Sequence, residues 1–115
     1  MNSGPEADQA LIDHMRECLS LITEFTGTER THFDGSRLVQ DAVIRNLQTM
    51  TESSQRLSEL IKATEPEVPW RKLAGFRNIL VHGYLGIDLA AVWSVVEQDL
   101  PGLSAALDRM AQRCA

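Results

Sequence analysis

Apolar residues recur along most of this chain at intervals of three or four positions, the spacing that places them on one face of an α-helix. The first such stripe predicts a helix from about Asp8 to Phe25, and Gly27 is expected to end it. The apolar residues of this stripe are Leu11, Met15, Cys18, Ile22 and Phe25.

The strongest periodicity predicts a second helix after a polar, turn-rich segment at residues 27–35. Asp34 or Ser36 can cap it by accepting a hydrogen bond from a free backbone amide. Its stripe contains Val39, Val43, Leu47, Met50, Ser54, Leu57 and Ile61. The small residues Ser53 and Ser54 either let a neighbouring helix approach closely or leave one of the two exposed to solvent.

Prolines at positions 66 and 69 predict a break between the second helix and a third, which extends from about Trp70 to Val81. The third helix carries a stripe of Trp70, Leu73, Phe76 and Leu80. Gly83 and Gly86 mark its end.

Asp88 can cap a fourth helix, and Pro101 starts or kinks a last helical stretch. The apolar positions of these two segments are Leu89, Val92, Trp93 and Val96, then Leu103, Leu107 and Met110. No segment has the alternation typical of a strand, and most connections are short. We therefore expect an all-α fold, an antiparallel helical bundle of four to five helices in one domain over residues 1–115.

The charge and composition narrow the classes of function. Eleven Lys and Arg against 16 Asp and Glu give a net charge of −5, which argues against non-specific coating of nucleic acid. No apolar run approaches the roughly 18 residues of a membrane helix, and the first residues lack the pattern of a secretory signal. We expect a cytoplasmic protein without membrane contact, in which Cys18 and Cys114 are reduced and structural.

The candidate chemistry lies in a locally basic stretch without acidic residues, between Glu67 and Asp88. On an ideal helix Arg77 and Tyr84 differ by about 20°, and Asn78 and His82 by about 40°, so each pair shares a face. Arg77 and His82 are about 140° apart. They converge only if the chain unwinds near Gly83 or if a second subunit completes the site.

An arginine and a histidine together can cleave RNA without a metal. Arginine grips a phosphate and stabilises charge on a phosphorane-like transition state, and histidine transfers protons near neutral pH. The structural alternative is a histidine that caps the last carbonyl groups of its helix. There is no glycine-rich phosphate loop, nucleophile elbow or compact cluster of His and carboxylate residues, so neither a metal site nor a cofactor is expected.

The other polar and aromatic candidates are interpreted as structural. His14 lies on a polar helix face and His32 in a loop, and neither is expected to act directly. Trp70 and Trp93 are expected to be core or interface anchors. Cys18 is interpreted as a core residue.

Eight blocks, in order and covering nearly the whole chain, carry a resemblance to a known family. They are Gln40–Leu47, Glu52, Arg56–Ser58, Pro66–Arg71, Arg77–Tyr84, Asp88–Leu89, Val92–Trp93 and Asp99–Pro101. With them the chain resembles the HepT-like branch of the HEPN domains, small all-helical proteins of prokaryotes. One departure is that Thr51, Ser53 and Ser54 replace the Gly and Ala residues usual around Glu52.

The resemblance implies the toxin of a two-gene toxin-antitoxin module, acting as a metal-independent endoribonuclease. Arg77 and His82 match the family's Arg-x4-to-6-His motif, and Tyr84 matches the tyrosine to which an MntA-type nucleotidyltransferase antitoxin adds AMP. The resemblance also implies a homodimer in which the two motifs face one another.

The resulting hypothesis is RNA cleavage, with RNA and not DNA as the substrate, in which Arg77 binds the scissile phosphate and His82 transfers protons. Asn78 is expected to orient the substrate or His82. The alternative is a non-catalytic HEPN interaction module that binds a minimal nucleotidyltransferase or a nucleotide.

Overall fold

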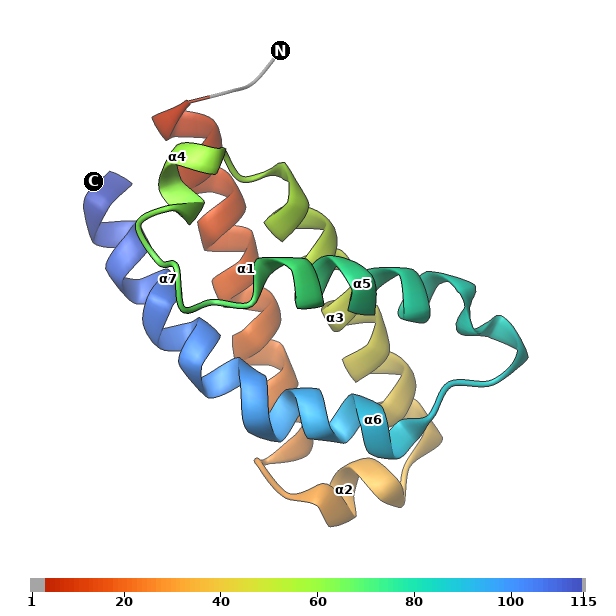
Figure 1. The fold of residues 1–115 in the computed structure, drawn as a ribbon. Helices are drawn as coiled ribbons and strands as arrows, with labels where there is room; N and C mark the ends of the chain where they lie inside the picture. The colour runs from red at the N-terminus through yellow and green to blue at the C-terminus, as the bar shows by residue number, and fades with distance from the viewer. Residues whose placement is uncertain (1–3, 115) are drawn as a thin grey trace.

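The computed structural model describes residues 4–114, apart from the side chain of Tyr84, and these residues are predominantly helical (Figure 1). The α-helices are α1 (Pro5–Thr26), α2 (Arg30–Asp34), α3 (Arg37–Arg56), α4 (Glu59–Lys62), α5 (Trp70–His82), α6 (Leu89–Ser94) and α7 (Leu100–Cys114). A 3-10 turn at Gly83–Leu85 follows α5, and a π-helical turn at Val95–Asp99 joins α6 to α7. Residues 4–114 contain no strand, which confirms the all-α prediction.

Helix α1 lies at the centre of the bundle, with α3 on one side and α7 on the other, and both run antiparallel to it (Figure 1). Helix α5 lies across α3, and the short helix α2 closes the end of the bundle near α6. In the part of the chain that is described, no helix combines the length and the apolar character needed to span a bilayer.

Between α1 and α3, the end of α1 agrees with the sequence prediction, but the segment after it does not. Gly27 ends α1 in a left-handed conformation with φ 61°, and its N–H donates to the Thr23 carbonyl over 2.8 Å. The segment expected to be a loop contains α2, so the histidine at position 32 is helical. Of the two possible caps of α3, the structure selects Ser36, whose Oγ accepts from the Val39 N–H over 3.1 Å.

The prediction of the second helix is wrong at its C-terminal end, because α3 ends at Arg56 and does not continue through Ile61. Leu57 is extended, and Ser58 caps the separate helix α4. The buried carboxylate of Asp8 accepts hydrogen bonds from the Ser58 N–H over 2.9 Å and from the Ser58 hydroxyl over 2.6 Å. A partner 50 residues away in the sequence therefore stabilises the break.

The core joins the inner faces of the long helices. Its fully buried side chains include Ile12, Met15, Phe33, Val43, Leu47, Met50, Val92, Leu107 and Met110. Ser53 and Ser54 are also buried, so the small residues of α3 do lie in a close contact between helices.

The later helices begin as the sequence predicts. Helix α5 starts after Pro69 and ends at Gly83, and the Asp88 carboxylate caps α6 through the N–H groups of Ala90 and Ala91. Pro101 has no N–H, so the Glu97 carbonyl cannot receive its usual α-helical hydrogen bond. The π-helical turn accommodates this interruption before α7 continues.

Candidate functional site

Arg77 points from α5 toward α3. Its Nη2 lies 3.8 Å from Oε1 of Glu52, and its side chain is 33% exposed. The Nε atom is buried and has no hydrogen-bond partner within residues 4–114. The guanidinium is thus held against α3 at one edge, and its partly exposed Nη groups are the donors that a ligand could reach.

His82 lies at the other end of the motif, in the last turn of α5, and its side chain is exposed. Its Nδ1 lies 3.0 Å from the Asn78 carbonyl oxygen. This bond assigns the proton to Nδ1 when the ring is neutral, which leaves Nε2 as the free acceptor. It is also the helix-capping contact expected from the structural alternative, and the two roles are compatible because Nε2 remains available.

Asn78 connects the two residues of the motif. Its side-chain Oδ1 accepts a hydrogen bond from Arg77 Nη1 over 3.5 Å, a long contact, while its backbone carbonyl contacts His82. The Asn78 side chain is therefore hydrogen-bonded to the arginine, whereas the histidine is bound by the Asn78 backbone.

The turn after His82 depends on the absence of a side chain at Gly83. A Cβ atom added there would overlap the side chain of Ile87. The backbone of Tyr84 lies in this 3-10 turn, while the side chain that is the predicted AMP acceptor lies outside the described part of the structure.

Within one chain, Arg77 and His82 interact with different groups. No hydrogen bond joins them in the part of the chain that is described, and each has a different partner: Glu52 for the arginine and the Asn78 carbonyl for the histidine. The 3-10 turn begins only after His82, so it does not bring the two side chains together. The separation of about 140° expected on an ideal helix agrees with this arrangement.

Glu52 is a site residue whose role is not apparent from the sequence. It lies on α3, 25 positions before the motif, and accepts a hydrogen bond from Gln48 Nε2 over 3.2 Å. Periodicity places Glu52 next to the buried stripe of α3, but only the packing of α5 on α3 brings it to Arg77. The sequence signal that could have identified Glu52 as a site residue is its place among the blocks that carry the family resemblance.

The two remaining histidines have structural contacts. His14 Nδ1 lies 2.7 Å from Ser53 Oγ, and its Nε2 lies 3.6 Å from Cys18 Sγ, which links α1 to α3. His32 Nδ1 lies 2.9 Å from the Thr26 carbonyl oxygen. Cys18 is buried and free, as expected for a core residue, and burial raises the pKa of its thiol.

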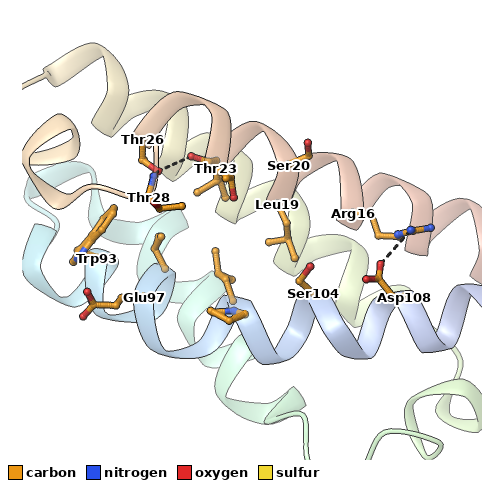
Figure 2. Close-up of a pocket in the computed structure, with 14 residues that line it drawn as sticks. Arg16, Leu19, Ser20, Thr23, Thr26, Thr28, Trp93, Glu97, Ser104 and Asp108 are labelled. Carbon is orange, nitrogen blue, oxygen red and sulfur yellow. Dashed lines mark hydrogen bonds and ion pairs between the residues drawn. The ribbon is translucent and has the colours of Figure 1, made fainter.

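A separate cavity of about 430 Å³ lies between α1 and the helix formed by α6, the π-helical turn and α7 (Figure 2). The ion pair of Arg16 with Asp108, at 3.1 Å, lies at one end of it, and Trp93 lies at the other. Trp93 is buried and packs on Phe33, which confirms its interpretation as a core anchor. None of the residues of the Arg77–His82 motif lines this cavity.

The described residues contain no group of three or more His, Cys, Asp and Glu side chains arranged to hold a metal ion. The polar groups around the motif are instead a guanidinium, an imidazole, an amide and one carboxylate. They can bind a phosphate and transfer a proton.

Comparison with known families identifies the kind of domain. Residues 15–110 match the family model described as "Ribonuclease HepT-like". The chain belongs to this family. The HepT-like match includes all of α3 and α5, and therefore the Glu52, Arg77 and His82 positions.

Two curated relatives of this HepT-like chain are similar to it over most of their lengths. It is 32% identical over 102 residues to a "Probable ribonuclease HepT" of Thermococcus cleftensis, covering 86% of this chain and 91% of the relative. It is 33% identical over 94 residues to the "Putative RNase MJ1380" of Methanocaldococcus jannaschii, covering 81% and 86% respectively. No solved structure matches this chain significantly.

Proposed function

We propose that this protein is a metal-independent endoribonuclease, the toxin of a toxin-antitoxin module, which cleaves RNA with Arg77 and His82. The observation that carries this proposal is the position of a partly free guanidinium and an exposed imidazole on one helix of a HepT-like domain. The names of the relatives, which include ribonuclease and RNase, support RNA as the substrate.

The proposed reaction is an internal transesterification. The ribose 2′-hydroxyl attacks the adjacent phosphorus, and Nε2 of a neutral His82 accepts the hydroxyl proton. The bond to the 5′-oxygen breaks, and that oxygen takes a proton from a histidinium or from water. The products are a 2′,3′-cyclic phosphate and a 5′-hydroxyl end, while Arg77 stabilises the negative charge on the pentacoordinate phosphorus.

A homodimer belongs to this proposal, because no hydrogen bond joins the two residues within the described part of one chain. Ile79 is 60% exposed and lies three positions before His82, on the same side of α5, and Leu85 is 93% exposed just beyond it. Large exposed apolar side chains beside a polar motif are typical of a contact surface. A second subunit on this surface would place its own motif opposite the first.

Tyr84 is the proposed acceptor of AMP. Its backbone follows His82 by two residues, so a nucleotide attached there would add a negative phosphate beside the cationic motif. That phosphate would compete with RNA for Arg77, and inhibition would need no large conformational change. The proposed partner is an MntA-type nucleotidyltransferase antitoxin encoded with the protein.

The deciding experiment incubates the purified protein with structured RNA in the presence of EDTA. We expect cleavage that leaves 2′,3′-cyclic phosphate ends and that disappears in His82→Ala and Arg77→Ala. Loss of cleavage on chelation, or cleavage at the wild-type rate by both variants, contradicts the proposal. A wild-type protein that leaves RNA intact but binds a nucleotidyltransferase or a nucleotide would support the non-catalytic module instead.

A further inference from the structure

A groove that none of the motif residues lines lies elsewhere on α3 and α5. It has a volume of about 740 Å³ and lies between the end of α3, helix α4 and the first turns of α5. Its lining includes Gln55, Lys62, Trp70, Arg71 and Ala74.

The groove and the Arg77 motif are built from the same two packed helices, α3 and α5. Ala74 precedes Arg77 by one turn of α5, and Gln55 follows Glu52 by one turn of α3, so each pair shares a helix face. At about 100° and 1.5 Å per residue, Arg71 lies about 120° around α5 from Arg77 and about 9 Å along its axis. That is the length of two to three stacked bases at about 3.4 Å each.

Arg71 supplies a positive charge that the protein itself does not neutralise. Its side chain is exposed and forms no ion pair or side-chain hydrogen bond with any residue that the structure describes. The acidic side chain of the groove, Glu59, is already paired with Lys62 at 3.0 Å. Glu59, Lys62 and Arg71 together therefore carry one net positive charge. It lies on the Arg71 guanidinium, a group suited to bind a phosphate.

Trp70 supplies a fixed aromatic surface next to this charge. Its indole Nε1 donates to the Glu65 carbonyl over 3.2 Å, which orients the ring, and the side chain is only half-buried. Aromatic rings beside arginine are the combination with which proteins stack and hold unpaired bases of single-stranded RNA.

We propose that this groove binds the single-stranded RNA segment next to the scissile phosphate, with a base on Trp70 and a phosphate on Arg71. The inference rests on the proposed function and deepens it, because it assigns a substrate conformation. RNA whose neighbouring nucleotides are paired in a duplex cannot place a base on Trp70. Such RNA is expected to be cut more slowly.

The test compares two neighbouring cations of α5 in protein made inactive by His82→Ala. Arg71→Ala removes the groove cation. The matched control Lys72→Ala removes an equal charge one residue later, from a side chain that does not line the groove and that pairs with Asp99 at 2.8 Å. Fluorescence anisotropy with a labelled single-stranded RNA oligonucleotide then measures affinity over a range of salt concentrations.

We expect Arg71→Ala to weaken binding about tenfold, and the slope of log affinity against log salt to fall by about 0.7, the value for one phosphate contact on a single strand. Lys72→Ala should bind within about twofold of the parent, because a screened surface charge away from the RNA contributes little. Equal binding by the two variants overturns the inference.

Trp70 fluorescence gives a second measurement. The chain has two tryptophans, so Trp93→Phe leaves Trp70 as the single emitter. We expect the oligonucleotide to quench this emission as it binds, and unchanged emission on a bound complex overturns the base-stacking role. If wild-type protein cleaves RNA while Arg71→Ala and Lys72→Ala behave alike, only the groove is excluded. If wild-type protein neither binds nor cleaves RNA, the proposed function fails with it.

Discussion

The guanidinium of Arg77 on α5 lies 3.8 Å from the carboxylate of Glu52 on α3, which links the two helices at the motif. Glu52 is itself held by Gln48 one turn earlier. Because both charged side chains are partly exposed, this pair adds little to folding stability. Its effect is to restrict where the guanidinium can lie, which matters for a group that must meet a phosphate.

Glu52→Gln tests this positioning role. Without the carboxylate the guanidinium is less restricted, and we expect kcat for RNA cleavage to fall about tenfold. The thermal midpoint should stay nearly unchanged, because both side chains of the pair are partly exposed to solvent. As a control, Asp34→Asn removes a similar ion pair with Arg30, at 3.1 Å on α2, and should leave kcat unaltered. Unaltered kcat in Glu52→Gln would show that Arg77 does not need this partner.

Ile79→Glu tests the dimer. Light scattering of the wild type should report twice the 12.8 kDa of one chain, and the charged variant should be monomeric and inactive. Leu60→Glu is the control, since Leu60 is 83% exposed on α4, away from the motif. A wild-type monomer would contradict the dimer. A variant that still dimerises would show that the subunit contact does not include Ile79.

Mass measurement tests whether Tyr84 is the acceptor of AMP. After co-expression with a cognate nucleotidyltransferase, intact-mass measurement should show added AMP groups, together with loss of ribonuclease activity. Tyr84→Phe should remain unmodified and active under the same conditions. An unmodified but inhibited wild-type protein would mean that the partner acts by binding alone.

The interactions of the Glu65 carboxylate predict that the protein loses stability in acid. Hydrogen bonds from Arg109 and Arg113 lower the pKa of its carboxyl from 4.5 to about 2. The folded pKa lies below the unfolded one, so the stabilisation is complete above about pH 4.5 and is lost as the pH falls toward 2. Urea denaturation should therefore show a large loss of stability for Glu65→Gln near neutral pH and a smaller loss in this acid range. Glu24→Gln, at an exposed position of α1, should follow the wild type, and a loss for Glu65→Gln that does not vary with pH would exclude this linkage.

Asp8→Ala tests the contact that ends α3. The substitution leaves the N–H and hydroxyl of Ser58 without their acceptor, and we expect a loss of about 1–3 kcal/mol in the free energy of unfolding. Asp13→Ala, at an exposed position of the same helix, should change it by less than about 0.5 kcal/mol. Similar values for the two variants would show that the break at Leu57 is stable without Asp8.

Local rules in the sequence determined most of the helices. Apolar spacing located α1, α3, α5 and the α6–α7 segment, because a helix that buries one face must repeat apolar residues every three or four positions. Gly27 and Asp88 fixed helix ends through contacts within four residues. The same local pattern separated Arg77 from His82 on α5, and no hydrogen bond joins them in the part of the chain that the structure describes.

Only the tertiary structure decided the features that depend on distant residues. The stripe of α3 continues through Leu57 and Ile61, so periodicity could not locate the break that Asp8 stabilises from 50 positions away. The pairing of Glu52 with Arg77 likewise appears only when α5 packs on α3. A helical pattern specifies which side of a helix is buried, but the residues of other helices that meet its polar side are set by packing.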